Sequence, residues 1–466
     1  MILWIACIAQ FVVTLDVAIV NVALPAMQQG LDLSGAGQQW VVNAYAIGFA
    51  GLLLLGGTVA DLIGVKRAFL AGLTLFAVVS LIGGLATSGT VLIISRAAQG
   101  VGAALLAPAT LTLITTTFTE PTARTRALGA WSAVMAAGGA SGAVIGGLLT
   151  QYAGWRWVMF VNVPVAVALG IAALSQVPAA ATARGALRRL DIPGAVLATC
   201  GLAVLVFGIV SLETHAPTSP TVWAPAAAGL LLLGSFFAVE SKVKRPLLPL
   251  RMLRMRSLVT ANAVTVAMGA SMFALWFILS LALQQVLGYS PVRAGLGFLP
   301  GTIGLAGGAQ ISTRVVGRMG PRRLLVSGLL LSTLGFWWFS GISSQGSYAS
   351  DVLGPLFVTT LGLGLSMTPL TVLATTGVER ADAGLASGLV NTSRQVGGAL
   401  GLAVLASIAA RTTSHETHTQ HTTVQTALAH GYSHALLFAA VFTAVAAGIA
   451  LLLPSPKDSG RRHRRG

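Results

Sequence analysis

Two charged residues stand in the middle of long apolar runs, where solubility cannot explain them. Asp16 lies near the centre of one run, and Arg96 lies in another, with Gln99 following it at helical spacing. A charge deep inside an apolar segment is costly, so such residues face a protein interior and are functional candidates. We therefore interpret Asp16 as a proton carrier and Arg96 as its partner in proton coupling.

A proton carrier needs two states of its carboxyl group. Burial away from water favours the neutral acid, whereas a nearby guanidinium favours the carboxylate. We expect Arg96 to pair with Asp16 in one conformation and to leave it in another, which lets the proton bind. Two other interpretations stay open: Asp16 as a structural acid bonded to neighbouring helices, and Arg96 as a fixed anchor on carbonyls or water.

The elements that must position these residues are membrane-spanning helices. Of the 466 residues, 55% are hydrophobic and only 9% are charged, with a mean hydropathy of +0.83. One bilayer crossing takes roughly 20 apolar residues, and the charge clusters and Pro/Gly breaks leave about fourteen such runs. The expected spans are 2–28, 38–60, 68–88, 91–118, 127–150, 155–177, 192–212, 222–240, 258–287, 293–313, 324–343, 351–377, 384–410 and 433–453. The predicted fold class is an all-α polytopic membrane protein.

The net charge of +16 has a topological explanation. Lys and Arg gather in the even-numbered loops between the expected spans and in the tail, whereas the odd-numbered loops hold only Arg156, Arg293 and Arg411. The positive-inside rule then places both termini in the cytoplasm, as for a multi-pass protein of a bacterial inner membrane. Nucleic acid is not needed as a partner. Anionic lipid at the cytoplasmic face is the expected partner. The basic segment 240–256 is interpreted as an amphipathic connector that lies on this lipid, and a solvated loop is an equally good interpretation.

An internal repeat divides the chain. The segment 57–67 matches the segment 313–323, and Arg124 matches Arg380 at the same offset. Transporters are often built from such repeated halves, with the binding site between them. The predicted organisation is an N-terminal six-helix bundle at 1–177, cytoplasmic linkers with inserted helices at 178–257, a C-terminal six-helix bundle at 258–453 and a basic cytoplasmic tail at 454–466.

Several motifs share the spacing of one transporter family. The run 15–25 reads Leu-Asp-x-x-Ile-Val-Asn-Val-Ala-Leu-Pro, and the run 96–102 reads Arg-x-x-Gln-Gly-x-Gly. The loop 57–67 reads Gly-x-x-x-Asp-x-x-Gly-x-Lys-Arg. A fourth pattern consists of Trp155, Arg156, Trp157, Phe160, Asn162 and Pro164. Together these motifs resemble the major facilitator superfamily, and specifically its fourteen-helix drug:proton antiporter branch.

The resemblance implies a major facilitator fold, two six-helix bundles plus two inserted helices. It implies a proton-coupled exporter of amphipathic or cationic small molecules, such as drugs or antibiotics, that works by alternating access. The expected partners are the small-molecule substrate, protons and the bilayer, with a monomeric protein and no cofactor, since a proton gradient supplies the energy. Two alternatives stay open: proton-coupled export or uptake of one metabolite, and a membrane sensor or channel. An enzyme is not expected, because no nucleophile, metal or acid-pair pattern is visible.

The loop 57–67 is interpreted as part of a conformational gate at the cytoplasmic rim. Asp61 can accept hydrogen bonds from a neighbouring helix N-terminus and from basic side chains when the cytoplasmic side is closed. The predicted gate consists of Gly57, Asp61, Gly64, Lys66, Arg67, Arg124 and Arg126. A topology determinant without a switching role is the alternative. In the second half Gly317 stands at the position of Asp61, so the acid is missing there.

Small residues line one face of the predicted fifth span. Gly138, Gly142 and Gly146 recur every four residues, which places them on one helix face and lets two backbones approach closely. With Gly147 they resemble the helix-packing motif of the exporters. The chain departs from that motif because Ala143 stands where proline usually follows glycine.

Prolines at matching places in the two halves, Pro108 and Pro369, suggest helix breaks around a substrate cavity. Ordinary helix kinks are the alternative. Such a cavity would be apolar and aromatic with a few polar groups, although the same aromatic residues also suit lipid contact. The candidate lining residues are Asn21, Tyr45, Trp131, Met135, Trp276, Gln284 and Arg394.

A histidine series lies in the segment 411–432, which is expected to be the one long polar loop outside the cytoplasm. His415, His418 and His421 are spaced by three, which would allow metal binding. Because the surroundings are rich in Thr and hold no Cys, we predict a solvated loop and no metal site.

Overall fold

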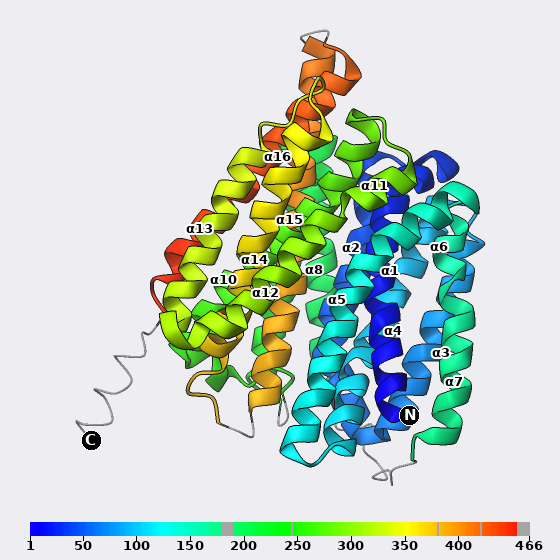
Figure 1. Ribbon diagram of the computed structural model, residues 1–466, viewed down its shortest axis with the longest axis vertical. Coiled ribbons are helices and arrows are strands. Elements are labelled where there is room, and N and C mark those ends of the chain that lie inside the picture. The colour runs from blue at the N-terminus through cyan, green and yellow to red at the C-terminus, as the bar shows by residue number, and fades with distance from the viewer. Residues whose placement is uncertain (179–189, 244–245, 380–381, 420–421, 454–466) are drawn as a thin grey trace. The chain divides into compact units, whose positions relative to one another are not determined.

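Long apolar runs fold into helices throughout the described part of the chain. The computed structural model describes residues 1–178, 190–243, 246–379, 382–419 and 422–453, and these contain helices and no strand (Figure 1). The all-α prediction is therefore confirmed. The predicted basic tail and the arginines of the segment 179–189 lie outside the described residues.

The helices group into two compact units. Unit 1 consists of Met1–Ser211, His215–Leu247 and Tyr289–Phe298, and unit 2 consists of Leu212–Thr214, Leu248–Gly288 and Leu299–Gly466. The segment Tyr289–Phe298 falls in unit 1, whereas the sequence places it in the C-terminal bundle. The reason is local, because the helix at Pro291–Gly297 packs against the helix of unit 1 that carries the glycine stripe.

Unit 1 holds the helices of the first half, several of which begin at a side-chain cap. Ser34, Ser88, Glu120, Asp191 and Ser219 each accept a hydrogen bond from a backbone N–H in the first turn that follows. The helices are α1 (Ile2–Leu31), α2 (Gly35–Ile63), α3 (Val65–Gly84), α4 (Gly89–Thr117), α5 (Pro121–Tyr152), α6 (Arg156–Phe160), α7 (Asn162–Gln176), α8 (Ile192–Val210), α9 (Pro220–Glu240) and α11 (Pro291–Gly297). The long helices α1, α5 and α7 run along the vertical direction of the view in Figure 1.

Close helix pairs form the core of unit 1. A side chain at Gly100 on α4 would collide with the carbonyl oxygen of Tyr45 on α2, and one at Gly48 would collide with that of Ala97. The two backbones are thus in contact where both glycines lie. Because α4 also packs on α3, its buried polar face reaches side chains from both neighbours.

Unit 2 contains the helices of the second half. They are α10 (Arg256–Leu281) with the π-turn η4 (Ala282–Val286), α12 (Leu299–Met319), α13 (Pro321–Phe339), the π-turn η5 (Tyr348–Leu353), α14 (Gly354–Thr375), α15 (Ala383–Thr419) and α16 (Val424–Ala450). A short 3-10 helix, η3 (Leu250–Arg254), precedes α10, and η2 (Ser211–Glu213) follows α8. The most extensive contacts in unit 2 join α13 with α14, α12 with α14 and α10 with α15.

Twelve of the described helices are long and apolar enough to cross a bilayer, so the chain is a multi-pass membrane protein. The helices α12 and α13, with 21 and 19 residues, correspond to the two remaining predicted spans. They are less apolar because arginines lie at the end of α12 and at the start of α13. The structure therefore supports twelve apolar spans where the sequence predicts fourteen.

Three local predictions differ from the structure. The segment 411–432 is not a long loop: α15 continues to Thr419 and α16 begins at Val424. The two helices are joined there, because Thr413 Oγ1 donates to the Ala427 carbonyl and Glu416 pairs with His430. His421 lies outside the described residues. The expected breaks at Pro108 and Pro369 are absent, since α4 and α14 run through both prolines. Conversely, the span 155–177 is divided at Val161 into α6 and α7.

Candidate functional site

A buried ion pair joins the two charged residues that the sequence singles out. Arg96 Nη1 lies 2.6 Å from Asp16 Oδ2, and Asp16 is 0% exposed while Arg96 is 1% exposed. The pair connects the centre of α1 with α4, entirely within unit 1. Charges removed from water in this way need further hydrogen bonds to offset the loss of hydration.

Two amide groups complete the surroundings of the Asp16 carboxylate. Asn162 Nδ2 donates to Asp16 Oδ1 at 2.7 Å, and Gln99 Nε2 donates to the same oxygen at 3.2 Å. With Arg96 on Oδ2, three donors from two helices meet one carboxyl group. Since all three donate, the arrangement suits the ionised form of Asp16.

Arg96 has partners other than Asp16. Its Nε donates to the carbonyl of Val41 at 3.2 Å, and its Nη1 also donates to Gln99 Oε1 at 2.8 Å. The guanidinium lies 4.5 Å from the centre of the Tyr45 ring, a cation–π distance. Gln99 is fixed in turn, because its Nε2 also donates to Ser80 Oγ at 2.7 Å.

Glycines of α5 seat α1 beside this network. A side-chain carbon added at Gly138 would lie 3.0 Å from the carbonyl oxygen of Phe11, and one at Gly142 would lie 3.0 Å from that of Leu15. At Gly146 it would lie 2.8 Å from the Cα of Ile19. The three glycines thus follow α1 from Phe11 to Ile19, about one turn on either side of Asp16. Gly147 instead faces Pro291 at the start of α11.

The predicted gate residues lie where α2 ends, at the start of α3 and at the start of α5. Gly64 joins α2 to α3 with a positive φ of 88°, and Lys66 Nζ donates to the carbonyl of Leu174 on α7 at 2.7 Å. Asp61 is exposed and forms no ion pair with Arg124 or Arg126, two described and exposed residues. Gly57 has ordinary room near Pro108, and Arg67 is exposed. The structure therefore does not bring Asp61 of the predicted gate together with Arg124 and Arg126.

The predicted cavity residues are spread over both units. In unit 1, Asn21 donates to its own helix at Val17, Tyr45 faces Arg96, and Trp131 Nε1 donates to Thr110 Oγ1 at 3.3 Å. Met135 is half-buried on α5. In unit 2, Trp276 is half-buried, Gln284 donates to Ser280 Oγ at 3.1 Å, and Arg394 donates to Asn391 Oδ1 at 2.5 Å.

Comparison with known proteins identifies the family and the fold to which this arrangement belongs. The sequence profile of the Major Facilitator Superfamily matches residues 6–402. The chain belongs to the Major Facilitator Superfamily. Among solved structures, a bacterial homologue of the human lysosomal transporter Spinster, captured inward-facing and unoccupied, superposes with a TM-score of 0.71. The match covers 97% of this chain and 96% of the other at 16% sequence identity, which shows a shared fold.

Curated relatives of this Major Facilitator protein are similar over most of their length. The cephamycin export protein CmcT of Amycolatopsis lactamdurans is 43% identical, with 88% of this chain and 85% of the relative covered. The puromycin resistance protein pur8 of Streptomyces alboniger is 39% identical, with 87% and 81% covered. The tetracenomycin C resistance and export protein of Streptomyces glaucescens is 36% identical, with 85% and 73% covered.

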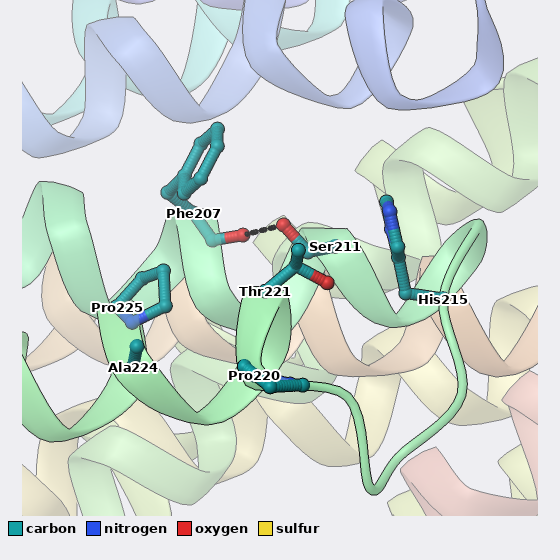
Figure 2. A pocket seen from close by; sticks show the side chains of 7 residues that line it. All are labelled: Phe207, Ser211, His215, Pro220, Thr221, Ala224 and Pro225. Carbon is teal, nitrogen blue, oxygen red and sulfur yellow. Dashed lines mark hydrogen bonds between the residues drawn. The ribbon is translucent and has the colours of Figure 1, made fainter.

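A hollow in this Major Facilitator protein lies away from the predicted cavity residues. It has a volume of about 480 Å³ and is formed by the ends of α8 and α9. Figure 2 shows Phe207 and His215 on opposite sides of it, with Thr221 and Ser211 between them and the Ser211 hydroxyl bonded to the Phe207 carbonyl. Its walls are mostly apolar, and it shares no residue with the Asp16 network.

The sequence does not predict two members of the network as site residues. Asn162 appears there only as part of a family pattern, and Ser80 does not appear at all. Both are buried polar residues inside otherwise apolar spans, the same signal that identifies Asp16. That signal gives no partner, however, because the three helices concerned are far apart in the chain.

Proposed function

We propose that this chain is a proton-coupled exporter of drug-like small molecules, such as antibiotics, of the fourteen-helix drug:proton antiporter branch. In this proposal α8 and α9 are the inserted pair between two six-helix halves. Three curated relatives that carry export or resistance in their names support the class of substrate. The observation that carries the coupling is the fully buried pair of Asp16 and Arg96.

The pair supplies a chemical basis for exchange. In the present geometry three donors meet the Asp16 carboxyl group, an arrangement that suits its carboxylate form. When a proton binds, the Coulomb attraction to Arg96 disappears and the guanidinium keeps Val41, Gln99 and the Tyr45 ring as partners. Protonation therefore loosens the contact between α1 and α4 without stranding the cation. A carrier that alternates in this way links proton binding to a rearrangement of helices.

The energy available is sufficient for export. One charge that moves through about 100 mV gains about 2.3 kcal/mol. Asp16 is the one acid that the described residues place deep in a span of unit 1, so we propose one proton per cycle. Exchange for a monovalent cation is then electroneutral and driven by the pH difference, whereas export of a neutral compound also responds to voltage.

The membrane arrangement follows from the basic loops. We propose a bacterial inner-membrane location with both termini in the cytoplasm, where basic side chains meet anionic lipid. This places Asp61, Arg124 and Arg126 at the cytoplasmic rim, where they would approach when that side closes. The exposed positions of all three in the structure leave room for such a movement.

Transport by purified protein in liposomes tests the proposal. Proteoliposomes with an imposed pH difference are given ethidium, a fluorescent cation, and its accumulation is followed with and without nigericin, which abolishes the pH difference. The proposal expects accumulation that nigericin abolishes and that protein-free liposomes lack. Saturable exchange that ignores the pH difference would contradict proton coupling, and the absence of saturable flux for ethidium, puromycin and a cephamycin would contradict drug export.

A further inference from the structure

Asn162 brings to Asp16 a hydrogen-bond acceptor that no described group occupies. Its Nδ2 donates to Asp16 Oδ1 at 2.7 Å, while its own Oδ1 is buried and has no hydrogen-bond partner among the described residues. The side chain is 1% exposed, at the first position of α7, directly after the break at Val161. Buried polar atoms are nearly always hydrogen-bonded, so an unpaired oxygen beside a carboxyl group calls for an explanation.

The neutral form of Asp16 needs such an acceptor. A carboxylate accepts hydrogen bonds only, whereas a carboxylic acid also donates one. Arg96 has donors alone, and Gln99 Oε1 already accepts from Arg96 while Gln99 Nε2 donates to Ser80. The amide oxygen of Asn162 is a buried acceptor without a partner among the described residues, on a side chain that already contacts Asp16.

We infer that Asn162 is a positioning residue that serves both protonation states of Asp16, donating from Nδ2 to the carboxylate and accepting at Oδ1 from the acid. The inference rests on the proposed proton-coupled function. A proton from water binds Asp16 Oδ1, the Asn162 amide turns over about its terminal bond, and the new O–H donates to Asn162 Oδ1. When the proton returns to water, the amide turns back. No other group changes its charge.

The charged and titratable groups around Asp16 are few. Arg96 faces it from α4 and Tyr45 lies beside Arg96 on α2. The helices α5, α6, α7 and α11 also pack on α1, and their described basic residues are engaged elsewhere or exposed: Arg156 binds the Ala86 carbonyl and Arg293 lies on the Tyr289 ring. Asp16 is therefore the group that gains and loses the proton at this site, and Asn162 is its neutral partner from α7.

Three substitutions separate hydrogen-bonding chemistry from shape. Asn162→Leu keeps the number and branching of the side-chain heavy atoms but removes donor and acceptor. Asn162→Ser keeps a group that both donates and accepts, and Asn162→Asp keeps the acceptor and loses the donor. Each is measured in proteoliposomes for the pH profile, kcat and KM of ethidium transport driven by a pH difference. The expected result for Asn162→Leu is a kcat lowered about tenfold or more with KM within about twofold.

The other two variants make the inference falsifiable. Asn162→Ser should retain kcat within about threefold, and Asn162→Asp should move the midpoint of the pH profile upward by about one unit, since two adjacent carboxyl groups share a proton. A wild-type pH profile and kcat in Asn162→Leu, or equal damage in the Ser and Leu variants, would overturn it. If Asn162→Leu does not fold, an unmoved midpoint in Asn162→Asp overturns it. Wild-type protein without pH-driven transport would instead refute the proposed function.

Discussion

Arg96 and Asp16, 80 positions apart in the chain, meet at 2.6 Å in the buried interior of unit 1. The contact is held by both sides. On one side, Arg96 is braced by the Val41 carbonyl and the Tyr45 ring, and on the other, Asp16 is braced by Asn162. The pair thus connects four helices, α1, α2, α4 and α7, and its protonation bears directly on how they pack.

Removing the Arg96 charge alone should destabilise the protein more than removing both charges of the pair. We expect Arg96→Gln to lower the free energy of unfolding by about 3–5 kcal/mol, because a buried carboxylate loses its counter-charge. The double variant Asp16→Asn with Arg96→Gln should recover most of that loss. Unfolding in detergent micelles, followed by tryptophan fluorescence, gives the comparison. A double variant less stable than Arg96→Gln alone would show that the lost counter-charge is not the cause of the destabilisation.

The contact between α1 and α5 should require glycine at the positions that touch the α1 backbone, and not at every glycine of α5. A side-chain carbon at Gly146 would lie 2.8 Å from the Ile19 Cα, whereas one at Gly139 meets only the Thr14 methyl at 3.9 Å. We expect Gly146→Ala to cost about 1–3 kcal/mol through overpacking. The control Gly139→Ala should be neutral or stabilise by up to about 1 kcal/mol. Equal melting temperatures of the two variants would exclude a backbone contact at Gly146.

The turn between α2 and α3 should require glycine at one position. Gly64 has a φ of 88°, in a region where a side chain is strained, whereas Gly57 lies within α2 with ordinary space beside Pro108. We expect Gly64→Ala to lower stability by about 1–2 kcal/mol. Gly57→Ala is the matched control and should lower it little or not at all. Thermal unfolding of both variants is the measurement, and an unaffected Gly64→Ala would contradict the strained turn.

The start of α5 should give a pH-dependent contribution to stability. Glu120 accepts hydrogen bonds from the backbone N–H groups of Ala123 and Thr122, which lower the pKa of its carboxyl group. The cap is therefore fully effective above the ordinary pKa of Glu and is lost as the pH falls through the lowered value. Wild type should exceed Glu120→Ala in melting temperature at neutral pH, and the difference should vanish in acid. A difference that grows toward low pH would contradict this account.

Sequence reasoning finds the helices and the buried charges but not the close contacts. Asp16 and Arg96 stand out because a charge is rare within an apolar span, and the structure places them together. Asn162 carries the same signal more weakly, since a neutral amide costs less to bury than a charge. Its contact with Asp16 depends on how α7 packs on α1, which no local pattern encodes.

The errors in the sequence prediction also have physical causes. Composition makes the Thr- and His-rich segment 411–432 resemble a loop, but α15 continues and contacts α16: Glu416 Oε2 lies 2.6 Å from His430 Nδ1, and Thr413 Oγ1 donates to the Ala427 carbonyl. Proline suggests a break in α14, yet the helix continues through Pro369. Bonds between helices, such as those from α15 to α16, outweigh the helix propensity of the local sequence, and they are visible only once the helices are placed.

The most direct test of the central claim compares wild type with Asp16→Asn in two assays on the same proteoliposomes. One assay measures ethidium accumulation under an imposed pH difference, and the other measures exchange of labelled for unlabelled ethidium without any gradient. If Asp16 carries the proton, Asp16→Asn loses gradient-driven accumulation while exchange persists. Accumulation in Asp16→Asn at the wild-type level would show that the proton is carried elsewhere and would contradict the account.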